Sequence, residues 1–226
     1  MYSSLMSAFV ACCILLSYIS ATEAACKAKS CLGVTIYYES LCGDSKRFIS
    51  GQLVPTYPEL KDYLDIFFVP YGKASHERDG ATGEWTFSCQ HGPPECDGNK
   101  AQACGLHAIK AEEKAYDQQR LSVEFVGCVM ARSDPAGAAR RCAESVGLEN
   151  STQLILEDCQ QSSLTDNLLV NYGEITHSFK PLISFVPTIV INDKYSWEDQ
   201  MMALTNFKKL ICNYLPQNDK PSTCQG

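Results

Sequence analysis

Basic residues are too few and too scattered in this chain to form a nucleic-acid-binding surface. The 226 residues include 19 Lys and Arg against 26 Asp and Glu, which gives a net charge of −7. Because nucleic-acid binding relies on clustered cations that meet phosphates, we do not expect the chain to bind nucleic acid. The Gly-x-Ser-x-Gly motif of serine hydrolases is also missing, so nothing in the sequence supports that class of enzyme.

Apolar runs long enough to cross a bilayer, about 20 residues, are missing too. Residues 5–19 form a shorter apolar run that small residues follow, which predicts a secretory signal peptide over residues 1–24. The segment before this run has no Lys or Arg, which is atypical for a signal peptide, and an uncleaved anchor helix is the alternative. We expect residues 25–226 to form a single domain of the secretory pathway, with no membrane span after cleavage.

Cysteine, in contrast, is abundant. Of 13 cysteines, Cys12 and Cys13 lie in the predicted leader. Eleven remain: Cys26, Cys31, Cys42, Cys89, Cys96, Cys104, Cys128, Cys142, Cys159, Cys212 and Cys224. In an oxidising compartment such a density predicts disulfides, and the odd number leaves one thiol unpaired. Parity does not tell which cysteine is free.

Cys42 is the best candidate for the free, reactive thiol. Residues 34–38 are mostly β-branched or aromatic and predict a buried strand, and residues 46–54 predict a helix. Cys42 therefore lies where a strand leads into the N-terminus of a helix. The free amide groups and the helix dipole stabilise a thiolate there, and the thiolate is the nucleophilic form. A structural disulfide at Cys42 is the alternative.

The order of predicted elements is that of a thioredoxin-like α/β domain. Residues 64–70 predict a second strand, parallel to the first in a βαβ unit. Next come a loop over 73–83, a short strand over 85–89, helices over about 99–180, a strand over 185–191, an antiparallel return over 194–197 and a last helix. This βαβ…ββα order predicts a thioredoxin-like fold with a mainly helical insertion. Such folds carry Cys-x-x-Cys after the first strand, where this chain has Cys42-Gly43-Asp44-Ser45.

A family resemblance rests on the segment from Cys89 to Cys104. This segment reads CQHGPPECDGNKAQAC and matches the pattern C-Q-H-G-x2-E-C-x2-N-x4-C. With residues 37–43 and 69–72, it resembles the gamma-interferon-inducible lysosomal thiol reductases (GILT). The resemblance implies a thioredoxin-fold reductase of the lysosome or the exterior that acts on protein disulfides at acidic pH. It also implies that Val186 and Pro187 form the cis-proline loop that faces the reactive cysteine.

Ser45 departs from the family pattern. In two-cysteine reductases, the second cysteine of Cys-x-x-Cys resolves the mixed disulfide, and a hydroxyl cannot do this. Ser45 could instead donate a hydrogen bond to the Cys42 thiolate, while Asp44 would oppose that thiolate as a like charge. Two-cysteine turnover is thus weakened or lost, and whether the protein is an enzyme stays open.

Three hypotheses follow for the function. In the first, Cys42 exchanges with disulfides of protein substrates and a small external thiol releases the product. In the second, the protein is a non-catalytic secreted binding protein on the GILT scaffold, and in the third it holds a partner in a mixed disulfide. Neither a cofactor nor a metal is expected, because Cys89, His91, Cys96 and Cys104 lack paired Cys-x2-Cys spacing. Asn150 begins the single glycosylation sequon and is expected to carry a glycan.

Overall fold

A mixed sheet of three strands lies at the centre of the protein. The computed structural model describes residues 26–225, so the predicted leader over residues 1–24 lies outside the described residues. The sheet has the order β2-β1-β5, with β2 parallel and β5 antiparallel to the middle strand β1. Its strands are β1 (Leu32–Tyr38), β2 (Leu64–Pro70) and β5 (Thr188–Ile191). Ile36 lies opposite Phe68 on one side and Ile189 on the other.

The predicted βαβ unit is confirmed. β1 leads into α1 (Gly43–Phe48), a π-helical turn η1 (Ile49–Leu53) and α2 (Val54–Leu60), and a 3-10 turn η2 (Lys61–Tyr63) connects to β2. Alternate residues of β1 point to one face of the sheet, where they join the buried side chains of this helical run in the main core. Cys42 therefore lies between a mostly buried strand and the start of this helical run.

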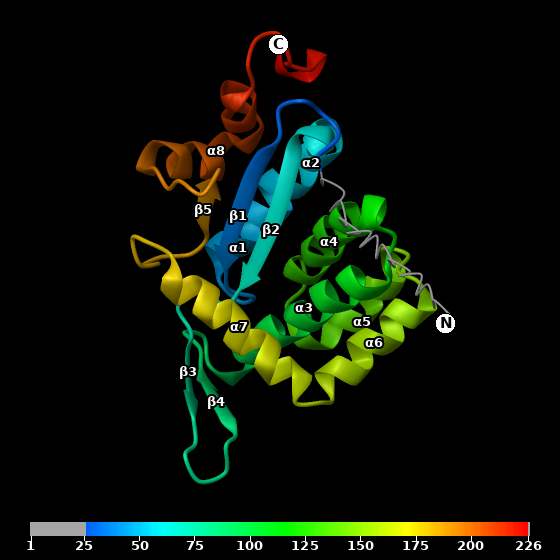
Figure 1. Cartoon of the computed structure of the whole chain (residues 1–226), viewed down its shortest axis with the longest axis vertical. Helices are drawn as coiled ribbons and strands as arrows, with labels where there is room; N and C mark the ends of the chain where they lie inside the picture. The colour runs from blue at the N-terminus through cyan, green and yellow to red at the C-terminus, as the bar shows by residue number, and fades with distance from the viewer. Residues whose placement is uncertain (1–25, 226) are drawn as a thin grey trace, which may run out of the picture.

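A block of five helices fills the chain between β4 and β5 (Figure 1). They are α3 (Pro93–Glu112), α4 (Ala115–Met130), α5 (Pro135–Ser145), α6 (Asn150–Gln160) and α7 (Leu164–Ser178). α7 lies against the other face of the sheet, where Tyr172 and Ile175 pack against Tyr37, Val69 and Val190. The block occupies the place of the predicted helical insertion, while the domain boundaries at 25–226 stay a prediction.

The loop predicted over residues 73–83 is partly wrong. β3 (Ser75–Arg78) pairs antiparallel with β4 (Trp85–Ser88), and this hairpin extends away from the body of the protein (Figure 1). The residues of β3 are polar and mostly exposed, so they carry no hydrophobic alternation that predicts a strand, whereas β4 confirms the short strand predicted over residues 85–89.

The antiparallel strand predicted over residues 194–197 is wrong, because the chain forms only a turn with one bridge there. Lys194 makes a single bridge to Ile191 across a tight turn in which Asn192 and Asp193 have positive φ. Ser196 then caps α8 (Trp197–Tyr214) by accepting a hydrogen bond from the Asp199 amide, and a 3-10 turn η3 (Ser222–Cys224) follows. The helices of residues 26–225 include none with the length and apolar character that a membrane span requires.

Five disulfides tie the described chain together, as the cysteine count predicted. The pairs are Cys26–Cys31, Cys89–Cys96, Cys104–Cys159, Cys128–Cys142 and Cys212–Cys224. The bridge from Cys104 to Cys159 joins α3 to α6 inside the helical block, and both of its residues are buried. Within residues 26–225, Cys42 is the one free cysteine.

Candidate functional site: a free thiol at a helix opening

Cys42 occupies the N-cap position of α1, as the sequence predicts. Its backbone is extended (φ −62°, ψ 121°), and its carbonyl accepts the first helical hydrogen bond, from the Lys46 amide at 3.0 Å. Because α1 continues without a break into η1 and α2, the side chain of Cys42 lies at the opening of a helical run that reaches Leu60. The free amide groups of such an opening favour negative charge on the sulfur.

The loop before β5 faces this sulfur. The Val186–Pro187 peptide bond is cis, and the Val186 carbonyl oxygen lies 3.6 Å from Cys42 Sγ. Gln200 of α8 holds this loop in place, because its buried amide accepts from the Ile189 N–H and donates to the Pro187 carbonyl, both at 2.9 Å. The structure thus brings Val186 and Pro187 to Cys42 across 144 residues of sequence.

An open pocket surrounds the partly exposed thiol. Its lining residues are Cys42, Gly43, Asp44, Arg47, Lys73, Gln90, His91, Phe185 and Val186. Asp44 forms an ion pair with Arg47, one helical turn away. Since the Arg47 guanidinium offsets the Asp44 charge, the repulsion predicted between Asp44 and a Cys42 thiolate is weakened.

Ser45 lies differently from the prediction. Its side chain is fully buried, and its hydroxyl accepts a hydrogen bond of 3.5 Å from the Glu39 amide. Among the hydrogen bonds of the described residues, Cys42 Sγ pairs with the Val186 carbonyl and not with Ser45. The hydroxyl therefore supports the loop before the helix rather than the sulfur.

The conspicuous segment from Cys89 to Cys104 packs against the loop that carries Cys42. Ser40 is the point of contact: its amide donates to Asn99 Oδ1 and its hydroxyl donates to the Glu95 carbonyl, both at 2.9 Å. A Cβ atom on Gly98 would lie 2.4 Å from Ser40 Oγ, so only glycine allows this approach. The segment thus fixes the position of the loop between β1 and Cys42.

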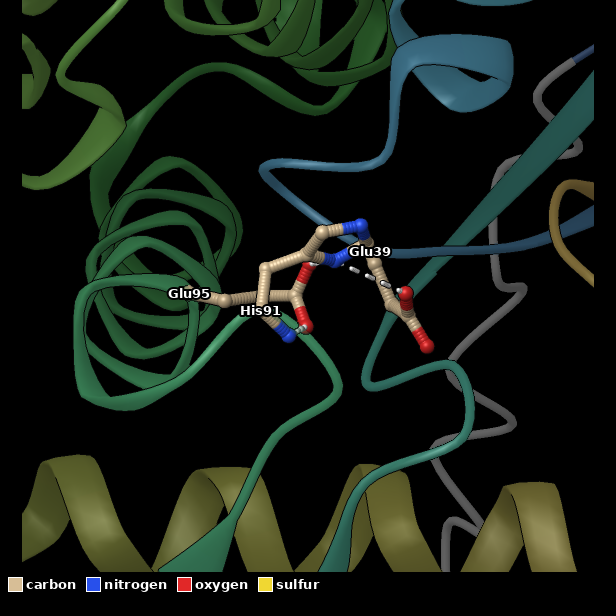
Figure 2. A group of neighbouring side chains, drawn as sticks. All are labelled: Glu39, His91 and Glu95. Carbon is tan, nitrogen blue, oxygen red and sulfur yellow. Dashed lines mark hydrogen bonds and ion pairs between the residues drawn. The ribbon is translucent and has the colours of Figure 1, made fainter.

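Glu39, His91 and Glu95 meet beside this loop (Figure 2). The His91 amide donates to Glu95 Oε1 at 3.0 Å, and His91 Nδ1 lies 2.5 Å from Glu95 Oε2 and 3.7 Å from Glu39 Oε2. Both carboxylates are buried, whereas 42 % of the His91 side chain is exposed. Burial raises the pKa of Glu39, and the nearby Glu95 carboxylate adds to this effect against a hydrogen bond from the Lys73 amide.

Comparison with known proteins identifies the family of this chain. The family model of the gamma interferon inducible lysosomal thiol reductase matches residues 33–146. The chain is 34 % identical over 220 residues to a GILT-like protein of Anopheles gambiae, covering 93 % of this chain and 88 % of that protein. The chain belongs to the GILT family.

Other relatives agree with the GILT assignment. GILT-like protein 1 of Drosophila melanogaster is 35 % identical over 210 residues, which cover 90 % of this chain and 81 % of that protein. The thiol reductase of Carassius auratus is 32 % identical, with 84 % of this chain and 71 % of that protein covered. Family membership supports thiol–disulfide exchange as the general chemistry of this GILT protein.

Solved structures confirm the thioredoxin-like fold. DsbA of Chlamydia trachomatis superposes with a TM-score of 0.51 at 14 % identity, covering 74 % of this chain and 78 % of that one. Oxidised BdbD of Bacillus subtilis gives a TM-score of 0.50 at 13 % identity, with 80 % and 91 % covered. At these identities the likeness concerns the fold alone.

The other residues considered in the sequence analysis, the cysteines among the possible zinc ligands and the glycosylation site, lie elsewhere in the GILT fold. Cys89 and Cys96 bond to each other, and Cys104 bonds to Cys159, so these sulfurs are not available as metal ligands. Asn150 is exposed at the start of α6, 108 positions after Cys42 in the sequence, and its glycan stays a prediction.

Arg47, Lys73, Gln90 and Phe185 line the pocket, and Glu39 lies beside it at His91, but none of these five was predicted as a site residue. Glu39 follows directly on an apolar strand and precedes Cys42 by three residues, which was the available signal. His91 and Glu95 stand four residues apart in the sequence, and their meeting with Glu39 was not predicted.

Proposed function

We propose that this GILT protein performs thiol–disulfide exchange on protein disulfides through one thiol, that of Cys42. The observation that carries the proposal is the position of Cys42: an unbridged, partly exposed sulfur at a helix opening, opposite the Val186 carbonyl in an open pocket. Such a placement favours the reactive thiolate. Asp44, Ser45, Val186 and Pro187 are proposed to support this site without reacting.

The exchange proceeds in two displacements. The Cys42 thiolate attacks one sulfur of a substrate disulfide, so a Cys42–substrate disulfide forms and the other substrate sulfur leaves as a thiolate that takes up a proton. A small external thiol, deprotonated, then attacks the substrate sulfur of this mixed disulfide. It ends bonded to the substrate, and Cys42 regains its thiolate.

The external thiol is required because the position of the second cysteine holds Ser45. Its hydroxyl is buried one turn into the helix and cannot displace sulfur from a disulfide. Two-cysteine turnover is therefore weakened or absent in this protein. We place the protein in the secretory pathway, extracellular or lysosomal, because five disulfides suit an oxidising compartment and relatives are named lysosomal reductases.

The second candidate is a non-catalytic binding protein on the same scaffold. Ser45 is the observation that favours it, since the substitution removes the group that completes the family's two-cysteine cycle. A protein that holds its partner in a stable mixed disulfide with Cys42 would be another form of this binding role.

Reduction of insulin disulfides at pH 5 with a small thiol separates these functions. We expect the wild type to exceed Cys42→Ser, and Ser45→Cys to exceed the wild type because it restores an internal resolving thiol. The double variant Cys42→Ser/Ser45→Cys is the matched control, since it carries the new cysteine without the attacking one.

Three results would contradict exchange through Cys42. If the wild type is no more active than Cys42→Ser while Ser45→Cys is active, the non-catalytic binding hypothesis replaces exchange. If mass spectrometry finds a persistent adduct on Cys42 and the assay shows no turnover, the hypothesis that Cys42 holds a partner in a stable mixed disulfide replaces exchange. If the double variant is as active as Ser45→Cys, Cys42 is not the attacking group.

A further inference from the structure

We propose that Glu39, His91 and Glu95 form a binding site for one divalent transition-metal ion, with Zn²⁺ as its representative. The three side chains converge from separate segments: the loop after β1, the loop after β4 and the first turn of α3 (Figure 2). One ligand atom from each lies within 4.8 Å of the other two. The proposed exchange at Cys42 uses none of these atoms, so the two proposals stand independently.

A buried carboxylate oxygen without a hydrogen-bond partner supports a cation site here. Glu39 is 1 % exposed, and its Oε1 accepts from the Lys73 amide at 2.8 Å. Its Oε2 is fully buried without a hydrogen-bond partner and lies toward His91 Nδ1 at 3.7 Å, too far for a hydrogen bond. Buried carboxylate oxygens are normally paired with a donor or a metal, since leaving one without a partner is costly.

A metal ion fits between these atoms with small side-chain movements. Zinc binds histidine nitrogen and carboxylate oxygen at about 2.0–2.2 Å, so neighbouring ligands in a tetrahedron lie roughly 3.4 Å apart. His91 Nδ1 stands 2.5 Å from Glu95 Oε2 and 3.7 Å from Glu39 Oε2, on either side of that spacing. His91 is the one partly exposed residue of the three, so its ring is free to move. A shift shorter than a covalent bond brings its Nδ1 atom to the ligand spacing from both Glu39 Oε2 and Glu95 Oε2.

The donor set selects the class of ion. One imidazole nitrogen with two carboxylate oxygens suits Zn²⁺ and its neighbours, whereas Mg²⁺ and Ca²⁺ prefer shells made of oxygen alone. Glu39 and Glu95 are almost completely buried, and within residues 26–225 the basic side chains that act on Glu39 are those of Lys73, which is exposed to solvent, and His91. On binding, His91 Nδ1 donates its lone pair and any proton it carries passes to the solvent.

The site adjoins the thiol pocket through His91. This residue lines the pocket of Cys42 and also contacts Glu95. An ion held there lies next to the pocket wall without using the sulfur, which matters for the design of the experiment, because a free thiol is itself a zinc ligand.

Zinc titration of the Cys42→Ser protein tests the proposal without interference from the thiol. Binding is measured by competition with a chromophoric zinc chelator and by the shift of the thermal midpoint. We expect one Zn²⁺ per chain and a raised midpoint, with no effect of Mg²⁺ at the same concentration. His91→Ala and Glu39→Gln, each added to Cys42→Ser, are expected to weaken zinc binding at least about 100-fold, since even losing an outer-shell partner costs 10–100-fold.

His107→Ala in the same background is the matched control, because His107 lies on α3 outside the cluster. His91 is partly exposed, so its variant keeps the fold even if a buried carboxylate variant does not; circular dichroism checks this. The proposal is overturned if the Cys42→Ser protein shows no saturable zinc binding. It is equally overturned if the His91→Ala protein binds zinc as tightly as the His107→Ala control.

Discussion

At the residue scale, Gly72 makes room for the buried Glu39 side chain beside the Cys42 loop. Gly72 has a φ of +62°, and a Cβ atom there would lie 2.2 Å from Glu39 Cγ and 2.6 Å from its Oε1. Both the backbone conformation and the lack of space therefore require glycine. The lack of a side chain at Gly72 thus leaves the space that the side chain of Glu39 occupies.

Gly72→Ala is expected to destabilise the protein by at least about 2 kcal/mol. The left-handed backbone costs an alanine roughly 1–2 kcal/mol, and forcing a side chain aside in a packed core costs about 1–3 kcal/mol. The free energy of unfolding in denaturant measures the change. Gly80→Ala is the control, because its Cβ would have no atom within 4 Å, and we expect a change within about 0.5 kcal/mol. Equal stability of the two variants would contradict the argument.

Single residues also mark the limit of what the sequence could predict about the site. Cys42 was predictable because strand and helix signals meet at it, and Val186 and Pro187 were placed opposite it by the resemblance alone. The partner of Ser45 was not predictable. Its hydroxyl turned to the Glu39 amide because the side chain is buried under the loop, and burial at one position depends on the whole packing.

At the scale of elements, the two parallel strands were predicted from their own residues. β1 and β2 are mostly apolar, and although Asp65 and Phe67 of β2 are exposed, the composition of both runs predicts strands. β3 was missed because it is exposed and polar, and it exists as a strand through its pairing with β4. The return after β5 was overpredicted, since the Ser196 cap starts α8 before a second strand can form.

Helix α7 covers one face of the sheet with a partly buried tyrosine, and the ionisation of this residue lowers the stability of the protein at alkaline pH. Tyr172 packs near Phe67 of β2, with ring centroids 6.5 Å apart, and burial raises the pKa of Tyr172 to about 12. In the unfolded chain tyrosine ionises near pH 10. The folded protein therefore retains the proton between about pH 10 and 12, where the unfolded chain loses it. Stability from this group is complete below about pH 10 and falls as pH rises toward 12.

Tyr172→Phe is expected to remove this part of the pH dependence. Between pH 9 and pH 11, the free energy of unfolding of the parent should fall by about 1 kcal/mol more than that of the variant, since one pKa unit corresponds to about 1.4 kcal/mol. Denaturant unfolding at both pH values measures it, in a Cys42→Ser background because a free thiolate would reshuffle disulfides. Tyr116→Phe, at a 61 % exposed position, should follow the parent. Parallel curves for Tyr172→Phe and the parent would contradict the assignment.

At the scale of the whole molecule, the disulfides connect parts that the sheet does not. Counting cysteines predicted five bridges and one free thiol, but parity could not give the pairing. Pairing depends on which helices meet: Cys104 of α3 reaches Cys159 of α6 only because these helices pack side by side in the helical block (Figure 1). The sequence thus predicted how many bridges there are, and the packing of the helices decides which cysteines they join.

The length of chain that each bridge closes predicts how much the bridge stabilises the protein. Cys104–Cys159 spans 55 residues and Cys212–Cys224 spans 12. If disulfides act mainly by restricting the unfolded chain, the longer loop contributes about 1.4 kcal/mol more, from the logarithmic dependence on loop length. Replacing each pair by two alanines and measuring unfolding in denaturant tests this. Cys104 and Cys159 are also more deeply buried than the other pair, so cavity formation adds to their loss. We therefore expect the loss of Cys104–Cys159 to cost more; equal costs for the two pairs would contradict the dependence on loop length.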